Sequence, residues 1–119
     1  MKVPQGYPGG KTEYKATLRA LKMCLKEIKN PNEARDIEFF CEFPTRTSAD
    51  KFALSAHQAG FSSLTLTEPD EDHPEYQVCA VVRIPVELDQ IVRVEMRMHE
   101  LADPAGGKYE GWGTLGDDP

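Results

Sequence analysis

Residues 37–44 read Ile-Glu-Phe-Phe-Cys-Glu-Phe-Pro, and this stretch decides the fold class. The apolar side chains at 37, 39, 41 and 43 alternate with residues 38, 40 and 42. Alternation of period two is typical of a β-strand with one buried face. Pro44 ends the strand because it has no backbone N–H to donate. The stretch therefore predicts a strand over 36–43 with its odd-numbered side chains turned toward the core.

Helical patterns surround this strand. Residues 12–30 carry an apolar stripe at spacings of four and three, capped by Thr12 and stopped by Asn30-Pro31, which predicts an amphipathic helix. A second helix begins at a Ser48 cap and ends at Gly60, where a left-handed residue is expected. A third spans 87–102. The predicted inward residues are Tyr14, Leu18, Leu21, Leu25 and Ile28, then Phe52, Ala53, Ala56 and Ala59, then Leu88, Ile91, Val94, Met98 and Leu101.

Three further strands are predicted at 62–67, 76–84 and 108–114. The order is one helix followed by β-α-β-β-α-β, which is the ferredoxin-like pattern of an α+β sandwich with a four-stranded antiparallel sheet. In this topology the strands at 36–43 and 76–84 are central. The extra N-terminal helix either joins the helical layer or covers the open sheet face, and the sequence does not decide between these. We expect residues 1–11 to form a flexible arm, and residues 12–119 to form a single domain with its βαββαβ core at 35–119.

The charge of the chain is unevenly distributed. The net charge is −6, but residues 1–30 hold seven basic and two acidic side chains, or +5, so the remainder carries −11. An acidic body repels phosphate backbones and favours basic partners, and ordinary solubility charge is the alternative explanation of this asymmetry. No apolar run reaches the ~18 residues of a membrane helix, so we expect no membrane contact and a cytoplasmic location.

Cys24, Cys41 and Cys79 form no CxxC pair, which indicates free thiols. Strand parity predicts that Cys41 and Cys79 lie on opposite faces of the sheet.

The sequence offers little for catalysis, cofactors or metals. Glu95 and His99 are one helical turn apart, but two ligands without a third are better interpreted as a solvated helix face. The acidic turn from Asp70 to His73 lacks the spacing and central glycine of a calcium loop. There is no nucleophile elbow and no phosphate-binding glycine loop.

RNA binding by the sheet is disfavoured because the 76–84 strand has no central aromatic residue, so the basic helix at 12–30 is the better candidate for any RNA contact.

The C-terminal run Tyr109-Glu110-Gly111-Trp112-Gly113-Thr114 and the stretches 37–50 and 59–61 carry a resemblance. Over residues 35–119 the chain resembles the RraB family, the regulators of ribonuclease E activity. The resemblance implies a ferredoxin-like fold and a cofactor-free protein inhibitor that binds the ribonuclease and modulates RNA degradation. The sequence departs from the family's named member in ending at Pro119 without a long acidic tail, and in having a basic rather than acidic first helix. The domain is similar also to small immunity-type proteins, so an interaction module with an unrelated partner is the alternative.

Two surfaces are candidates for binding a protein partner. The sheet face opposite the helices is expected to be an apolar patch with an acidic rim, and the acidic turn at 68–75 is the second candidate. A lone tryptophan at a strand end is more often core filler than contact, and Tyr109 and Trp112 can share a face only if the strand bulges. The candidate residues are Phe40, Glu38, Glu42, Val81, Tyr109, Glu110 and Trp112, together with Asp70, Glu71 and Asp72.

Overall fold

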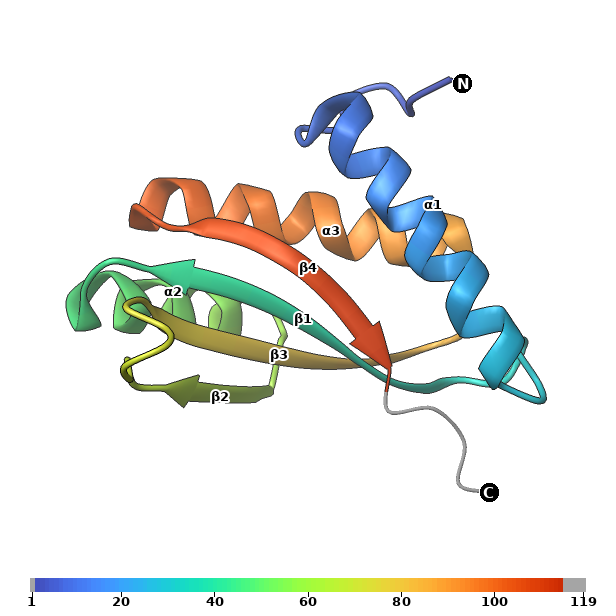
Figure 1. The fold of residues 1–119 in the computed structure, drawn as a ribbon. Coiled ribbons are helices and arrows are strands. Elements are labelled where there is room, and N and C mark those ends of the chain that lie inside the picture. The colour runs from blue at the N-terminus through green and yellow to red at the C-terminus, as the bar shows by residue number, and fades with distance from the viewer. Residues whose placement is uncertain (1, 115–119) are drawn as a thin grey trace.

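The computed structural model describes residues 2–114, which form three α-helices and one four-stranded sheet (Figure 1). The helices are α1 (Gly10–Glu27), α2 (Arg46–Gln58) and α3 (Leu88–Ala102), and a 3-10 turn, η1, spans Asp103–Ala105. The strands are β1 (Arg35–Phe43), β2 (Ser63–Thr67), β3 (Tyr76–Ile84) and β4 (Lys108–Thr114). The Gly-Trp-Gly motif lies within β4, and Pro119 lies outside the described residues.

The sheet is antiparallel with the strand order β2-β3-β1-β4, so the predicted ferredoxin-like topology is confirmed. Both central strands are the ones the sequence indicated. Their register places Phe39 opposite Ala80 and Cys41 opposite Val78 on one face, and Phe40 opposite Cys79 on the other. Cys41 and Cys79 are free thiols on opposite faces, as parity predicted.

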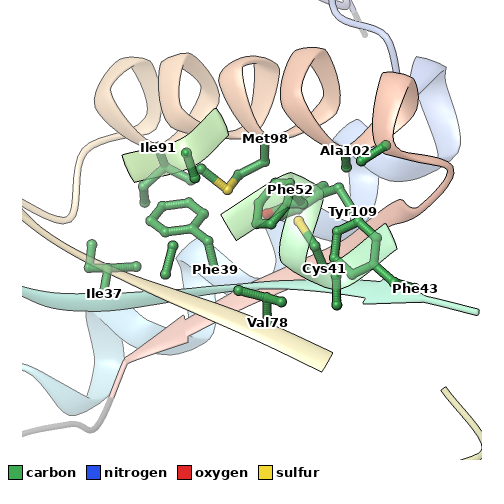
Figure 2. Close-up of a cluster of buried hydrophobic side chains, with 14 of the residues drawn as sticks. Ile37, Phe39, Cys41, Phe43, Phe52, Val78, Ile91, Met98, Ala102 and Tyr109 are labelled. Carbon is green, nitrogen blue, oxygen red and sulfur yellow. The ribbon is translucent and has the colours of Figure 1, made fainter. Parts of the chain in front are cut away.

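The core lies between the sheet and helices α2 and α3, as Figure 2 shows. Side chains from β1 and β3 contact both α2 and α3, which lie over the same face of the sheet. Its largest fully buried members include Phe39, Phe43, Phe52, Ile91 and Met98. Phe43 and Phe52 stack at a tilt, with their ring centroids 4.9 Å apart. Burying aromatic and branched side chains of this size supplies most of the stability of such a domain.

Helix α1 belongs to the helical layer. It lies on the same side of the sheet as α3 and packs against β4 (Figure 1). Leu21, Cys24 and Ile28 reach the main core, while Tyr14 joins a smaller cluster with Tyr7 and Val92. Within residues 2–114, the opposite face of the sheet is therefore left without a helix over it.

Three local predictions were wrong. Helix α2 begins at Arg46 with Thr45 as its cap, whose side-chain oxygen accepts a hydrogen bond from the Ser48 N–H, so Ser48 is not the cap. Helix α1 begins at Gly10, not after a Thr12 cap, and ends at Glu27, before Asn30. Leu25, expected inward on α1, is 43% exposed. Thr17 and Cys24 face the domain, so the buried stripe is rotated relative to the one that hydrophobicity indicated.

Candidate partner-binding face

The open face of the sheet presents a row of side chains from four strands. Across its middle the register aligns Thr65 of β2, Cys79 of β3, Phe40 of β1 and Gly111 of β4. The next row aligns Ser63, Val81, Glu38 and Gly113. Phe40 and Val81 are half-buried by their neighbours. An aromatic and a branched side chain therefore sit together at the centre of an uncovered surface.

Carboxylates border this apolar centre. Glu38 accepts a hydrogen bond from the Cys79 thiol, with the sulfur 3.6 Å from Glu38 Oε2. Burial raises the pKa of Cys79 to about 11, and the Glu38 charge acts in the same direction, so the thiol stays protonated at neutral pH. Two ion pairs lie on or beside this face: Arg83 with Asp36 at 3.3 Å, and Lys108 with Glu110 of the edge strand at 3.2 Å.

The acidic turn is continuous with this face. A hollow of about 250 Å³ at the end of the sheet is lined by Glu42 and Gln77 from the strands, and by Glu68, Asp70 and Glu75 from around the β2–β3 loop. Asp70 orders the loop, because its Oδ1 accepts hydrogen bonds from the N–H groups of Asp72 and His73. These bonds lower the pKa of Asp70. The two surfaces that the sequence indicated are thus one connected surface with an apolar centre and an acidic end.

On the other side of the sheet, a buried carboxylate joins four parts of the chain. Glu95 of α3 is 0% exposed and accepts hydrogen bonds from Tyr7 before α1, Thr17 on α1 and Tyr109 on β4. The oxygen distances are 3.1 Å from Tyr7, 2.8 Å and 3.0 Å from Thr17, and 2.7 Å from Tyr109. Burial raises the pKa of Glu95, although the hydroxyl donors oppose that shift. The interpretation of Glu95 as part of a solvated helix face was wrong.

His99 lies one helical turn after Glu95 and contacts α1 outside this hydrogen-bond network. Its Nε2 lies 2.8 Å from Glu13 Oε2, which links α3 to α1 a second time. Its ring also packs edge-on against Tyr109, with centroids 5.2 Å apart. Glu95 and His99 therefore hold the first helix in place. Among residues 2–114 no group of three His, Cys, Asp or Glu side chains is placed to hold a metal ion.

The chain matches known proteins over most of its length. A family model described as RraB, regulator of ribonuclease activity B, matches residues 15–114. The chain belongs to the RraB family. A curated relative, the regulator of ribonuclease activity B of Actinobacillus succinogenes, is 26% identical over 105 residues, which cover 87% of this chain and 74% of that protein.

The Gly-Trp-Gly run through which the chain resembles the RraB family has a structural explanation. The register between β1 and β4 shifts between Phe40 and Cys41, so that Tyr109 pairs with Cys41 and Trp112 with Phe39. This bulge turns both aromatic side chains toward the helices, where Tyr109 is buried and Trp112 packs against the core. Gly111 adopts φ +146°, a conformation that favours glycine. Trp112 is therefore core filler, which is the interpretation that the sequence favoured, and it does not belong to the open face.

The structure separates the sequence-derived candidates of this RraB-family chain into two groups. Phe40, Glu38, Glu42 and Val81 lie on the open face, Glu110 is exposed on the edge strand beside it, and the acids of the β2–β3 loop are exposed at its end. Tyr109 and Trp112 lie on the helix side. Sequence reasoning missed Glu95, Thr17 and Tyr7, because their contacts join residues 78 and 88 positions apart.

No helix of the described chain is long and apolar enough to cross a bilayer.

Proposed function

We propose that this protein regulates a ribonuclease by binding it stoichiometrically through the open sheet face, without catalysis of its own. The partner proposed first is ribonuclease E or an equivalent enzyme of the RNA-degrading assembly. The observation that carries the proposal is an uncovered sheet face with an apolar centre and a carboxylate rim, in a chain of the RraB family.

The chemistry of this face suits protein binding. Aromatic side chains near the centre of a patch supply most of the affinity of an interface, while rim charges set the association rate and the choice of partner. Phe40 has Cys79 beside it on β3 and Gly111 beside it on β4, so its ring is accessible to a partner. The surrounding carboxylates favour a basic segment over another acidic protein. We therefore assign Phe40 and Val81 as anchors, and Glu38, Glu42 and the β2–β3 loop acids as the steering rim.

The potentially reactive groups of the described chain support regulation rather than catalysis. Burial raises the pKa of Cys41 to about 12, and Cys79 is also held protonated, so neither thiol is a ready nucleophile. Glu95 is enclosed by three hydroxyl groups and already engaged. Cys41 is packed in the core, and Cys79 and Glu95 are engaged in hydrogen bonds.

The test is an RNA-cleavage assay with purified ribonuclease E of the host and increasing amounts of this protein. We expect the cleavage rate to fall and to level off at a fixed molar ratio, and the protein alone to leave the RNA intact. A rate that does not change at saturating protein, together with no complex by size-exclusion chromatography, would contradict the proposal.

Affinity capture from the native host separates this function from the alternative of an immunity-type module. Recovery of the ribonuclease with other components of its assembly supports regulation of RNA degradation. Recovery of a toxin in its place would support the alternative.

A further inference from the structure

The outer surface of helix α1 carries a row of positive charge. Lys15, Arg19, Lys22 and Lys26 are all exposed and follow one another at spacings of four, three and four residues. Residues at these spacings share one side of a helix. With a rise of 1.5 Å per residue, the row is about 16 Å long. We call these four residues the α1 basic row.

The row has no ion-pair partners within the described chain, whereas several other exposed cations do. Arg46 pairs with Asp50, Arg83 with Asp36, Arg97 with Glu100 and Lys108 with Glu110. No such ion pair is found for the members of the α1 basic row among residues 2–114. Like charges three and four residues apart destabilise a helix. The row is thus an unneutralised concentration of charge whose repulsion a polyanion would relieve.

The position of α1 restricts what that polyanion can be. A basic helix that lies in a lipid surface needs a free apolar face. The apolar side of α1 is already used, because Tyr14, Leu21 and Ile28 pack into the domain. Met23 and Leu25 are the large apolar residues of α1 that remain exposed, and residues two apart do not share a side of a helix. The row therefore suits a ligand that presents regularly spaced negative charge and requires no apolar insertion.

The acidic β2–β3 loop does not cancel this row. Figure 1 shows α1 and the β2–β3 loop, which holds the strongest acidic cluster, at opposite ends of the molecule. The molecule extends 39 Å along its longest axis. Charges farther apart than the Debye length, about 8 Å at physiological salt, are largely screened from each other. A phosphate chain on α1 would experience mainly the local positive charge.

We propose that the α1 basic row binds the phosphate backbone of single-stranded RNA. The choice of RNA among polyanions rests on the proposed function, because a regulator bound to a ribonuclease works beside RNA. Binding is independent of sequence, since the row supplies charge and no aromatic side chain for stacking on bases. It uses a surface distinct from the open sheet face, so one molecule can contact the enzyme and its substrate together.

Fluorescence anisotropy with a labelled, unstructured RNA oligonucleotide tests the proposal on the full chain. Four phosphate contacts give a slope of about −3 in a plot of log K against log salt, which weakens binding about 50-fold between about 50 and 200 mM salt. Replacing all four row residues by glutamine should flatten this slope and weaken binding at low salt by at least about tenfold.

The matched control replaces four of the paired cations, Arg46, Arg83, Arg97 and Lys108, by glutamine. Both variants go from a net charge of −6 to −10. We expect the control to bind RNA with nearly the affinity and salt slope of the unmodified protein. Equal losses in the two variants would overturn the proposal, because net charge alone would then explain binding. Absence of RNA binding by the unmodified protein at low salt would also overturn it.

Ribonuclease binding by the same variants keeps the two proposals distinguishable. The α1 variant should still form the ribonuclease complex in the absence of RNA while it loses RNA affinity. If the unmodified protein binds RNA through α1 but no ribonuclease, the proposed function fails and this inference stands.

Discussion

Replacing Glu95 by glutamine tests the buried junction between α1, α3 and β4 through its pH dependence. The carboxyl group is fully enclosed and takes hydrogen bonds from Tyr7, Thr17 and Tyr109. Glutamine has the same shape and no charge. At low pH, where the carboxyl is protonated, the two proteins differ only in the arrangement of these hydroxyl bonds. Their free energies of unfolding should then agree within about 1 kcal/mol.

The difference between the two proteins should change as the pH rises. Burial raises the pKa of Glu95 in the folded protein above its ordinary value of 4.5. The unfolded chain therefore releases this proton first, and the contribution of Glu95 to the free energy of unfolding falls until the folded-state pKa is passed. The loss can reach about 1.4 kcal/mol per pH unit. Glutamine does not titrate, so the unmodified protein should lose stability relative to the variant above pH about 4.5.

Urea denaturation at a series of pH values measures this difference, provided that the slope of the transition is the same in both proteins. Glu100→Gln on the same helix is the control, because Glu100 is exposed and pairs with Arg97 at the surface. The free energy of unfolding of Glu100→Gln should stay within about 1 kcal/mol of that of the unmodified protein at every pH. If the unmodified protein instead gained stability relative to Glu95→Gln as the pH rises, the reasoning would be refuted. That result would mean that the hydrogen bonds from the three hydroxyl groups lower the pKa of Glu95 by more than burial raises it.

Further substitutions test the local geometry of the sheet and of α2. Gly107→Ala should destabilise the protein by about 1–3 kcal/mol in thermal denaturation, since the added Cβ would lie 2.2 Å from Cδ1 of Phe43. Gly113→Ala should change the free energy of unfolding by less than about 0.5 kcal/mol in urea, because nothing lies within 4 Å of its Cβ position; a large loss would place this glycine in a packed site. Thr45→Ala should cost about 1 kcal/mol through the lost cap bond to Ser48, and an unchanged urea midpoint would show that this cap is dispensable.

The sheet could be predicted from the sequence because its signals are local. Strict alternation around Phe39 and Cys41 fixed which face of β1 is buried, and the apolar run near Val78 marked a central strand. The sequence did not predict the bulge in β4. It indicated only that Tyr109 and Trp112 would share a face if the strand bulged. Which face they share depends on pairing with β1, and pairing is a long-range property.

The helical side was harder to predict because its contacts are distant in sequence. On α1, Leu25 fits the apolar stripe, but the helix docks through Thr17 and Cys24 because Thr17 binds Glu95 and Cys24 lies against β4. A glutamate on a helix gives no local sign of burial when its hydroxyl partners come from other elements. Tyr7 lies in the segment for which the sequence predicts a flexible arm, and its hydrogen bond to Glu95 leaves no pattern in the sequence.

The central claim is that the open sheet face binds the ribonuclease, and the dissociation constant of the Phe40→Ala variant tests it most directly. Phe40 lies at the centre of that face, so its loss should weaken binding by about 2 kcal/mol, or about thirtyfold, in isothermal titration calorimetry. Leu54→Ala is the matched control, because Leu54 is an apolar side chain on α2 that is 60% exposed. Both variants should keep the melting temperature of the unmodified protein, and Leu54→Ala should keep its affinity as well. An unchanged dissociation constant in a folded Phe40→Ala variant would contradict the claim.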